Sequence, residues 1–332
     1  MSAMIMGTDL SRLQMKSKAP QQKLQVVEEI EGLIKVHNDG HVDRPEIVPN
    51  VGCSLVPDLG VTCRDAIIDK YTNIWARIYV PTAANKLPLL LYFHGGGFCV
   101  GSASWSCYHE LLAKLAARAG CAVFSVSYRL APEHPLPAAY DDGVKAAVWA
   151  KQQEFAGVGS EWWAGRCDFS RIFLGGDSAG ANIAYNVGLR ANSIGVGVKG
   201  LLLIQPFFGG VARTRSEMCV ARSALTLAAS DAYWRMALPA GAGRDHPWCS
   251  TAGSEFGILR RAGAAVLVCV AEADILRDRN LEFCGGLARE GVRVEQVVSK
   301  GVGHAFHILN KSRLAQTRLH ELLSHVKNFV GR

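Results

Sequence analysis

Residues 171–187 read RIFLGGDSAGANIAYNV, and this segment carries the strongest signal for the fold. The apolar run at 171–175 predicts a buried strand, and residues 181–187 predict the start of a helix. Between them lies a G-x-S-x-G motif centred on Ser178. A serine at the apex of a strand, a sharp turn and a helix exposes its hydroxyl above the sheet. The stretch therefore predicts an α/β architecture with a nucleophile at this turn.

A second glycine-rich motif, His94-Gly95-Gly96-Gly97, follows the apolar run of residues 87–93. Backbone N–H groups in such a loop can point at the negative charge that a nucleophilic attack creates. We predict three donors for this oxyanion: the backbone amides of Gly96, Gly97 and Ala179. We predict three supporting residues around them: His94, Gly95 and Asp177. One motif alone is weak in a chain with 34 glycines, but the two together are specific.

A nucleophilic serine needs a base, and the base needs a carboxylate to orient it. In chains with this turn the order is serine, acid, histidine. The buried-strand pattern at 264–270 leads to Asp274, which we predict as the acid. The alternating pattern at 292–298 leads through a glycine-rich turn to His304, which we predict as the base. Four alternatives remain open: Glu272 or Asp278 as the acid, and His307 or His94 in direct catalysis.

The composition limits the classes of partner. The 332 residues carry a net charge of +7 without a run of five or six like charges, which argues against a nucleic-acid partner. Ten cysteines form no C-x-x-C pair and no cluster with histidine at metal spacing, so we expect reduced thiols, no metal or other cofactor, and a cytoplasmic location. No window reaches the roughly 18 apolar residues of a membrane span, and we expect an uncleaved chain that does not bind membranes.

Strand and helix patterns alternate along most of the chain, which predicts a mostly parallel eight-stranded sheet with helices on both faces. The strands are expected at 61–69, 74–80, 87–93, 121–128, 171–175, 201–206, 264–271 and 292–299. Helices are expected at 104–119, 137–155, 179–191, 278–290 and 311–330.

Two segments do not fit this sheet, and we expect them to cap a core of residues 51–332. The first is residues 1–50, where apolar positions at helical spacing predict a helix: Leu24, Val27, Ile30, Leu33 and Ile34. The second is an insert at about 208–258, with an expected helix bearing Tyr233 and Trp234. Core packing is the commoner fate of such aromatic residues, and lining of a pocket is the alternative.

Several further motifs resemble those of one family, the plant carboxylesterases of the hormone-sensitive-lipase-like branch of the α/β hydrolases. These are YRLAPEH at 128–134, PAAYDD at 137–142, PFFGG at 206–210 and RDHP at 244–247. The resemblance covers nearly the whole chain. It implies that Ser178, Asp274 and His304 form a catalytic triad that hydrolyses carboxylic esters through an acyl-enzyme. We expect small, short-acyl esters as substrates, because a capped pocket lined by bulky aromatic residues suits small groups. It also implies a helical cap. The chain departs from the family at Ala305, where many relatives carry glycine, and at Val211 and Ala212, where many carry acids.

The same resemblance leaves two other functions open. Gibberellin receptors resemble this family but have lost the histidine base, which this chain keeps at His304. The other alternative is an enzyme that, like some relatives, uses the triad for elimination or cyclisation of specialised plant metabolites. A small-molecule ester is the expected partner, and the sequence does not determine the oligomeric state.

Overall fold

The structure is a computed structural model, which describes residues 24–55, 57–83, 86–155, 161–220, 223–252 and 256–332. Its centre is an eight-stranded sheet in the order β11-β10-β9-β8-β6-β7-β5-β4. The strands are β4 (Val61–Asp69), β5 (Ile74–Pro81), β6 (Leu87–Phe93), β7 (Ala122–Ser127), β8 (Cys167–Asp177), β9 (Val198–Ile204), β10 (Ala265–Ala271) and β11 (Val294–Ser299). Only β5 runs antiparallel to its neighbours in this sheet. The predicted mostly parallel sheet is thus confirmed.

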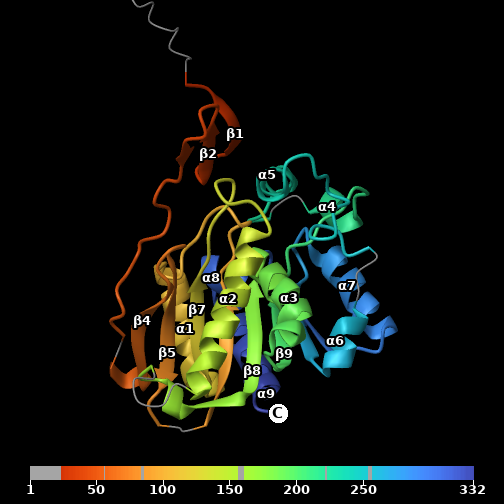
Figure 1. Ribbon diagram of the computed structural model, residues 1–332. Coiled ribbons are helices and arrows are strands. Elements are labelled where there is room, and N and C mark those ends of the chain that lie inside the picture. Colours follow the sequence, from red (N-terminus) through yellow and green to blue (C-terminus); the bar gives the residue numbers. More distant parts are fainter. Residues whose placement is uncertain (1–23, 56, 84–85, 156–160, 221–222, 253–255) are drawn as a thin grey trace, which may run out of the picture.

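Helices cover both faces of the sheet (Figure 1). One face packs against α1 (Ser106–Ala119) and α9 (Arg313–Val330). The other packs against α2 (Ala138–Gln152), α3 (Ala179–Ala191), α6 (Gly257–Ala262) and α7 (Arg277–Arg289). Short 3-10 helices occupy Pro57–Leu59, Gln153–Phe155, Ala164–Arg166 and Asn192–Ile194. The five predicted helices are all present, with small shifts at their ends.

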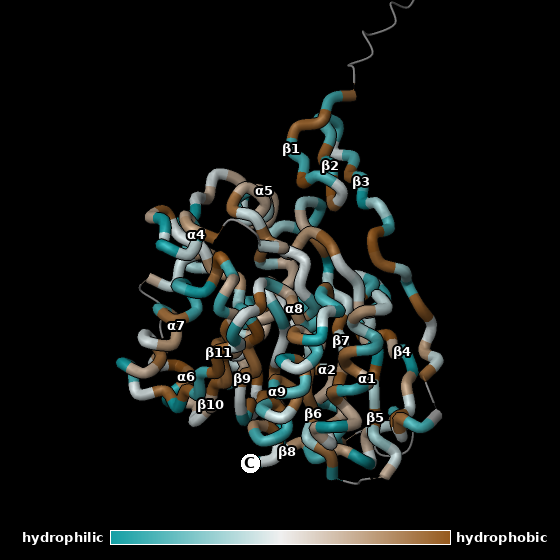
Figure 2. Tube along the Cα trace, turned by 180° about the vertical axis from the view of Figure 1, so that it is seen from behind, coloured by the Kyte–Doolittle hydropathy of each residue, from teal (hydrophilic) through white to brown (hydrophobic). Residues whose placement is uncertain are grey.

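The central strands are mostly apolar because both of their faces are covered. Along β6, Leu89 and Leu91 belong to the core beneath α2 and α3, whereas Leu90 and Tyr92 belong to the core beneath α1 and α9. Figure 2 shows the same distribution, with hydrophobic colour on central strands such as β9 and β10. Packing on both faces of the sheet holds each strand, and therefore its end, in place. The candidate site lies at these strand ends.

The helix predicted from Leu24 to Ile34 is wrong. The segment instead forms a small antiparallel sheet of β1 (Val26–Ile30), β2 (Ile34–His37) and β3 (Val42–Asp43). Ile30 and Ile34 pair across a tight turn in which Gly32 adopts a φ of 72°. Their spacing of four therefore reflects a hairpin, in which both side chains are buried, and β-branched residues favour strands. Residues 1–23 of the predicted cap segment lie outside the described residues.

The insert contributes α4 (Arg215–Cys219) and α5 (Leu227–Ala237). Figure 1 places α5 beside the small N-terminal sheet and α4 on the far side of α5, near α7, with both helices above the ends of the large sheet's strands. The Arg235 guanidinium on α5 donates two hydrogen bonds, of 2.8 and 2.9 Å, to the Glu28 carboxylate on β1. The two segments outside the sheet therefore contact each other directly. No helix in the described part of the chain is long and apolar enough to cross a membrane.

Candidate active site

Ser178 sits at a strained turn between β8 and α3. Its backbone angles, φ of 54° and ψ of −119°, lie in a region that residues other than glycine rarely adopt. A Cβ on Gly180 would lie 1.9 Å from the carbonyl oxygen of Phe93, and one on Gly176 would lie 2.4 Å from the carbonyl carbon of Gly180. Only glycine fits at either position. The G-x-S-x-G pattern thus follows from the close approach of the turn to β6.

The structure brings the three predicted triad residues together. The Oγ atom of Ser178 lies 3.0 Å from Nε2 of His304, and Nδ1 of His304 lies 2.7 Å from Oδ2 of Asp274. The Asp274 carboxylate is fully buried, and its Oδ1 accepts a hydrogen bond of 3.0 Å from the backbone N–H of Leu276. Both carboxylate oxygens therefore have partners, and the imidazole is held between serine and acid.

The electrostatic surroundings of His304 favour its protonated form. Burial by itself lowers the pKa of His304, but the Asp274 carboxylate and the hydrogen bond to it outweigh burial and raise that pKa above the ordinary value. An imidazole held in this way can accept a proton from Ser178 and bear the resulting charge.

Three backbone amides next to Ser178 remain free. The N–H groups of Gly96, Gly97 and Ala179 donate no hydrogen bond to any residue that the structure describes. Gly96 and Gly97 line the same cavity as Ser178, and Ala179 is the first residue of α3. The N–H of Gly95, in contrast, donates to the Tyr108 hydroxyl at 2.7 Å. The predicted oxyanion donors are thus available to a ligand.

Asp177 ties the serine turn to the glycine loop. It is buried, and its carboxylate accepts hydrogen bonds of 2.9 Å from the hydroxyls of Tyr92 and Tyr108. The Tyr108 hydroxyl also accepts a hydrogen bond from the N–H of Gly95, so this one hydroxyl links the serine turn to the glycine loop. Burial raises the pKa of Asp177, but His307, 3.7 Å away, and the two hydroxyls outweigh it and lower the pKa overall. The sequence contains no local signal for the tyrosine partners.

His94 braces the glycine loop from below. Its ring stacks on Tyr128 with centroids 4.3 Å apart, and its Nδ1 lies 2.8 Å from the carbonyl oxygen of Gly95. The Tyr128 hydroxyl donates to the carbonyl oxygen of His94 at 2.8 Å. Burial lowers the pKa of His94 to about 4, so the ring is neutral at neutral pH. His94 does not line the cavity, which leaves no place for it in direct catalysis.

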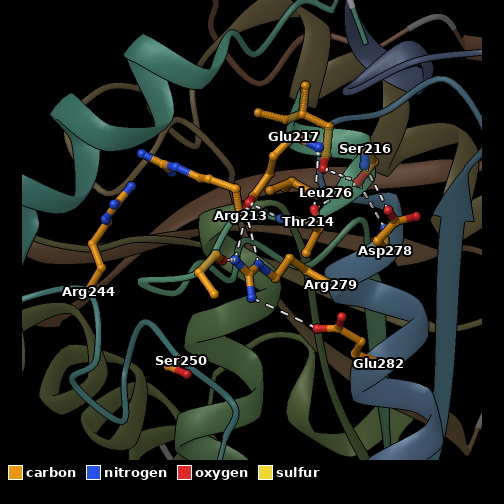
Figure 3. Close-up of polar contacts among 12 residues, drawn as sticks. Arg213, Thr214, Ser216, Glu217, Arg244, Ser250, Leu276, Asp278, Arg279 and Glu282 are labelled. Carbon is orange, nitrogen blue, oxygen red and sulfur yellow. Dashed lines mark hydrogen bonds and ion pairs between the residues drawn. The ribbon is translucent and has the colours of Figure 1, made fainter. Parts of the chain in front are cut away.

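The alternative acids and base lie elsewhere. Asp278 accepts a hydrogen bond of 2.7 Å from the N–H of Ser216 on α4 and so faces the insert (Figure 3). Glu272 accepts from the N–H of Gly301 at 2.9 Å. His307 is buried against Asp177 and does not line the cavity. Of the three acids weighed from sequence, only Asp274 forms a hydrogen bond with His304.

A cavity of about 140 Å³ opens over Ser178 and His304. Residues outside the large sheet supply much of its wall: Leu33, Ile47 and Val48 from the N-terminal segment, and Leu225, Ala229 and Tyr233 from the insert. Trp105 also lines it, whereas the Phe98 ring is buried in the core against Trp234. No lysine or arginine occurs among the described lining residues. The described residues also contain no group of three or more histidines, cysteines or carboxylates that could hold a metal ion.

The chain is similar to several known proteins. The profile of a family described as having the alpha/beta hydrolase fold matches residues 90–308. An Arabidopsis thaliana protein named probable carboxylesterase 6 is 53% identical, covering 92% of this chain and 91% of its own. A gibberellin receptor from the same plant is 32% identical, covering 91% and 88%. A solved esterase from Pyrobaculum calidifontis is 29% identical with a TM-score of 0.69, covering 81% and 84%.

Proposed function

The chain belongs to the α/β-hydrolase family, and from that premise we propose that it is a serine carboxylesterase acting on small-molecule esters. One observation carries the proposal: the Ser178 hydroxyl lies 3.0 Å from an imidazole that is itself bonded to a buried carboxylate. Free backbone amides beside the serine complete the set of groups that acyl transfer needs.

The roles follow from these positions. His304 takes the hydroxyl proton of Ser178 through Nε2 as the oxygen attacks the ester carbonyl. The tetrahedral oxyanion accepts hydrogen bonds from Gly96, Gly97 and Ala179. His304 then donates its proton to the departing alcohol, and a water molecule that it activates hydrolyses the acyl-enzyme. Asp274 holds the imidazole in the required tautomer throughout.

We also propose that residues 24–50 and the insert at about 208–258 act as a cap over a core of residues 51–332. Both segments contribute side chains to the wall above Ser178, and Arg235 joins them through Glu28. A cap of this kind limits the size of the ester. The cavity above the serine has a volume of only about 140 Å³, which supports a preference for short acyl groups. The cap contains strands as well as helices, unlike the all-helical cap expected from the sequence.

A cytoplasmic location is the remaining part of the proposal. All ten cysteines are free, which is usual for proteins in a reducing compartment.

The Ser178→Ala variant tests the proposal, with p-nitrophenyl acetate as substrate and Ser324→Ala, on the surface of α9, as the control. We expect the first variant to lose turnover by a factor of 10⁴ or more and the second to keep it. Labelling by a fluorophosphonate probe should depend on Ser178 in the same way, whereas a receptor without a working base should label slowly. Incorporation of ¹⁸O from labelled water into the acid product separates hydrolysis from elimination. Hydrolysis by Ser178→Ala at the parent rate would disprove the assignment.

A further inference from the structure

Tyr233 lies at the glycine loop although it comes from the insert. A Cβ added to Gly97 would lie 2.2 Å from Cγ of Tyr233, so the ring rests directly on the glycine that carries one of the free amides. Tyr233 also lines the cavity over Ser178, together with Phe207, whose ring centroid is 6.4 Å away. The side chain is therefore placed beside the position of an ester carbonyl.

The hydroxyl of Tyr233 has no role in the protein itself. Only 5% of the residue is exposed, yet the hydroxyl makes no hydrogen bond with any described residue. The tyrosines near the site behave differently, since the hydroxyls of Tyr92, Tyr108 and Tyr128 all donate to the protein. Because no protein group occupies this hydroxyl, it is free to exchange a hydrogen bond with water for one with a ligand bound in the cavity.

Few other groups in the cavity can recognise a substrate. Ser178 and His304 are hydrogen-bonded to each other, and so are Asp177 and Tyr108, so these polar groups already have partners within the protein. The Trp105 indole is shared with a neighbouring cavity of about 490 Å³. Burial raises the pKa of Tyr233, so its hydroxyl stays neutral and can both donate and accept at neutral pH.

We propose that Tyr233 is a specificity residue whose hydroxyl binds an oxygen-bearing group of the substrate close to the scissile carbonyl. This inference rests on the proposed esterase function and narrows its substrates. The preferred ester carries no carboxylate or other anionic group, because no lysine or arginine lies among the described lining residues to pair with one. It is apolar over most of its surface and carries a hydroxyl or carbonyl oxygen near the ester, on either the acyl or the alcohol side.

Two pairs of esters test the proposal on wild-type protein and Tyr233→Phe. The acyl pair is p-nitrophenyl butanoate and p-nitrophenyl 3-hydroxybutanoate, and the alcohol pair is butyl acetate and 3-hydroxybutyl acetate. The phenylalanine ring keeps its place on Gly97, so the measured quantity is the ratio of kcat/KM within each pair. In at least one pair we expect this ratio to shift by about tenfold toward the plain ester, which is the effect of one neutral hydrogen bond.

The exposed residue Tyr71 provides the matched control, because Tyr71→Phe removes the same atom far from the cavity. Tyr71→Phe should leave both ratios within twofold of wild type. If Tyr233→Phe also leaves both ratios within twofold, the specificity role is refuted while the esterase function stands. If the wild-type protein hydrolyses none of the four esters, the esterase function itself fails. An equal loss on all four would assign Tyr233 a structural role at Gly97 and would also refute the proposal.

Discussion

Replacing Asp274 by asparagine exchanges one carboxylate oxygen for an NH₂ group and should switch the catalytic imidazole to its other tautomer. In the structure Oδ1 of Asp274 accepts the N–H of Leu276 at 3.0 Å, and Oδ2 faces Nδ1 of His304 at 2.7 Å. An asparagine would keep its amide oxygen on the Leu276 N–H, because its NH₂ group cannot accept a hydrogen bond. The NH₂ group would then face Nδ1, which would have to become the acceptor.

Nε2 of His304 would then already carry a proton, so it could not accept the proton of Ser178. A tautomer of this kind costs about 10⁴ in kcat in a Ser-His-Asp site, which corresponds to about 5.4 kcal/mol at 1.36 kcal/mol per tenfold. The loss should appear in kcat rather than in KM, because the carboxylate does not touch the substrate.

The assay is steady-state hydrolysis of p-nitrophenyl acetate at neutral pH, with Asp278→Asn as the matched control. Asp278 faces Ser216 and Arg277 and has no contact with His304, so its variant should stay within a few fold of wild type. Circular dichroism and thermal unfolding confirm that both variants are folded. An Asp274→Asn enzyme within tenfold of wild type, or a larger loss for Asp278→Asn, would refute the assignment of the acid.

Two further predictions concern the base and the turn. The Asp274 carboxylate outweighs the effect of burial and raises the pKa of His304. We therefore expect kcat/KM to fall as the pH drops, with a midpoint above the ordinary histidine pKa of about 6.5. A midpoint below 6 in the pH–rate profile would contradict this. Gly180→Ala would place a methyl group 1.9 Å from the carbonyl oxygen of Phe93, and it should lower the free energy of unfolding by more than about 3 kcal/mol. Gly197→Ala is the control: its methyl group would meet nothing within 4 Å, and it should change the free energy of unfolding by less than about 0.5 kcal/mol. Urea unfolding measures both, and equal values for the two variants would be inconsistent with the described turn.

Much of this protein can be read from its sequence because the decisive signals are local. The turn at Ser178 needs only a strand, small residues and a helix in succession, and all of these lie within residues 171–187. The eight strands are recognisable because helices cover both faces of the sheet, which makes the central strands mostly apolar. The order of serine, acid and histidine then follows from the order of the strands whose ends meet at one edge.

Other features depended on contacts between distant parts of the chain. Spacing alone could not separate a hairpin from a helix at Ile30 and Ile34, because both place the two side chains on one side. Asp274, Glu272 and Asp278 follow the same strand, and only the direction of each side chain showed which one meets His304. The sequence by itself determined the sheet, the serine turn and the two glycine motifs, since each depends on neighbouring residues. Tertiary structure alone decided the hydroxyl partners of Asp177 and the placement of Tyr233 on Gly97, because those contacts join residues far apart in the chain.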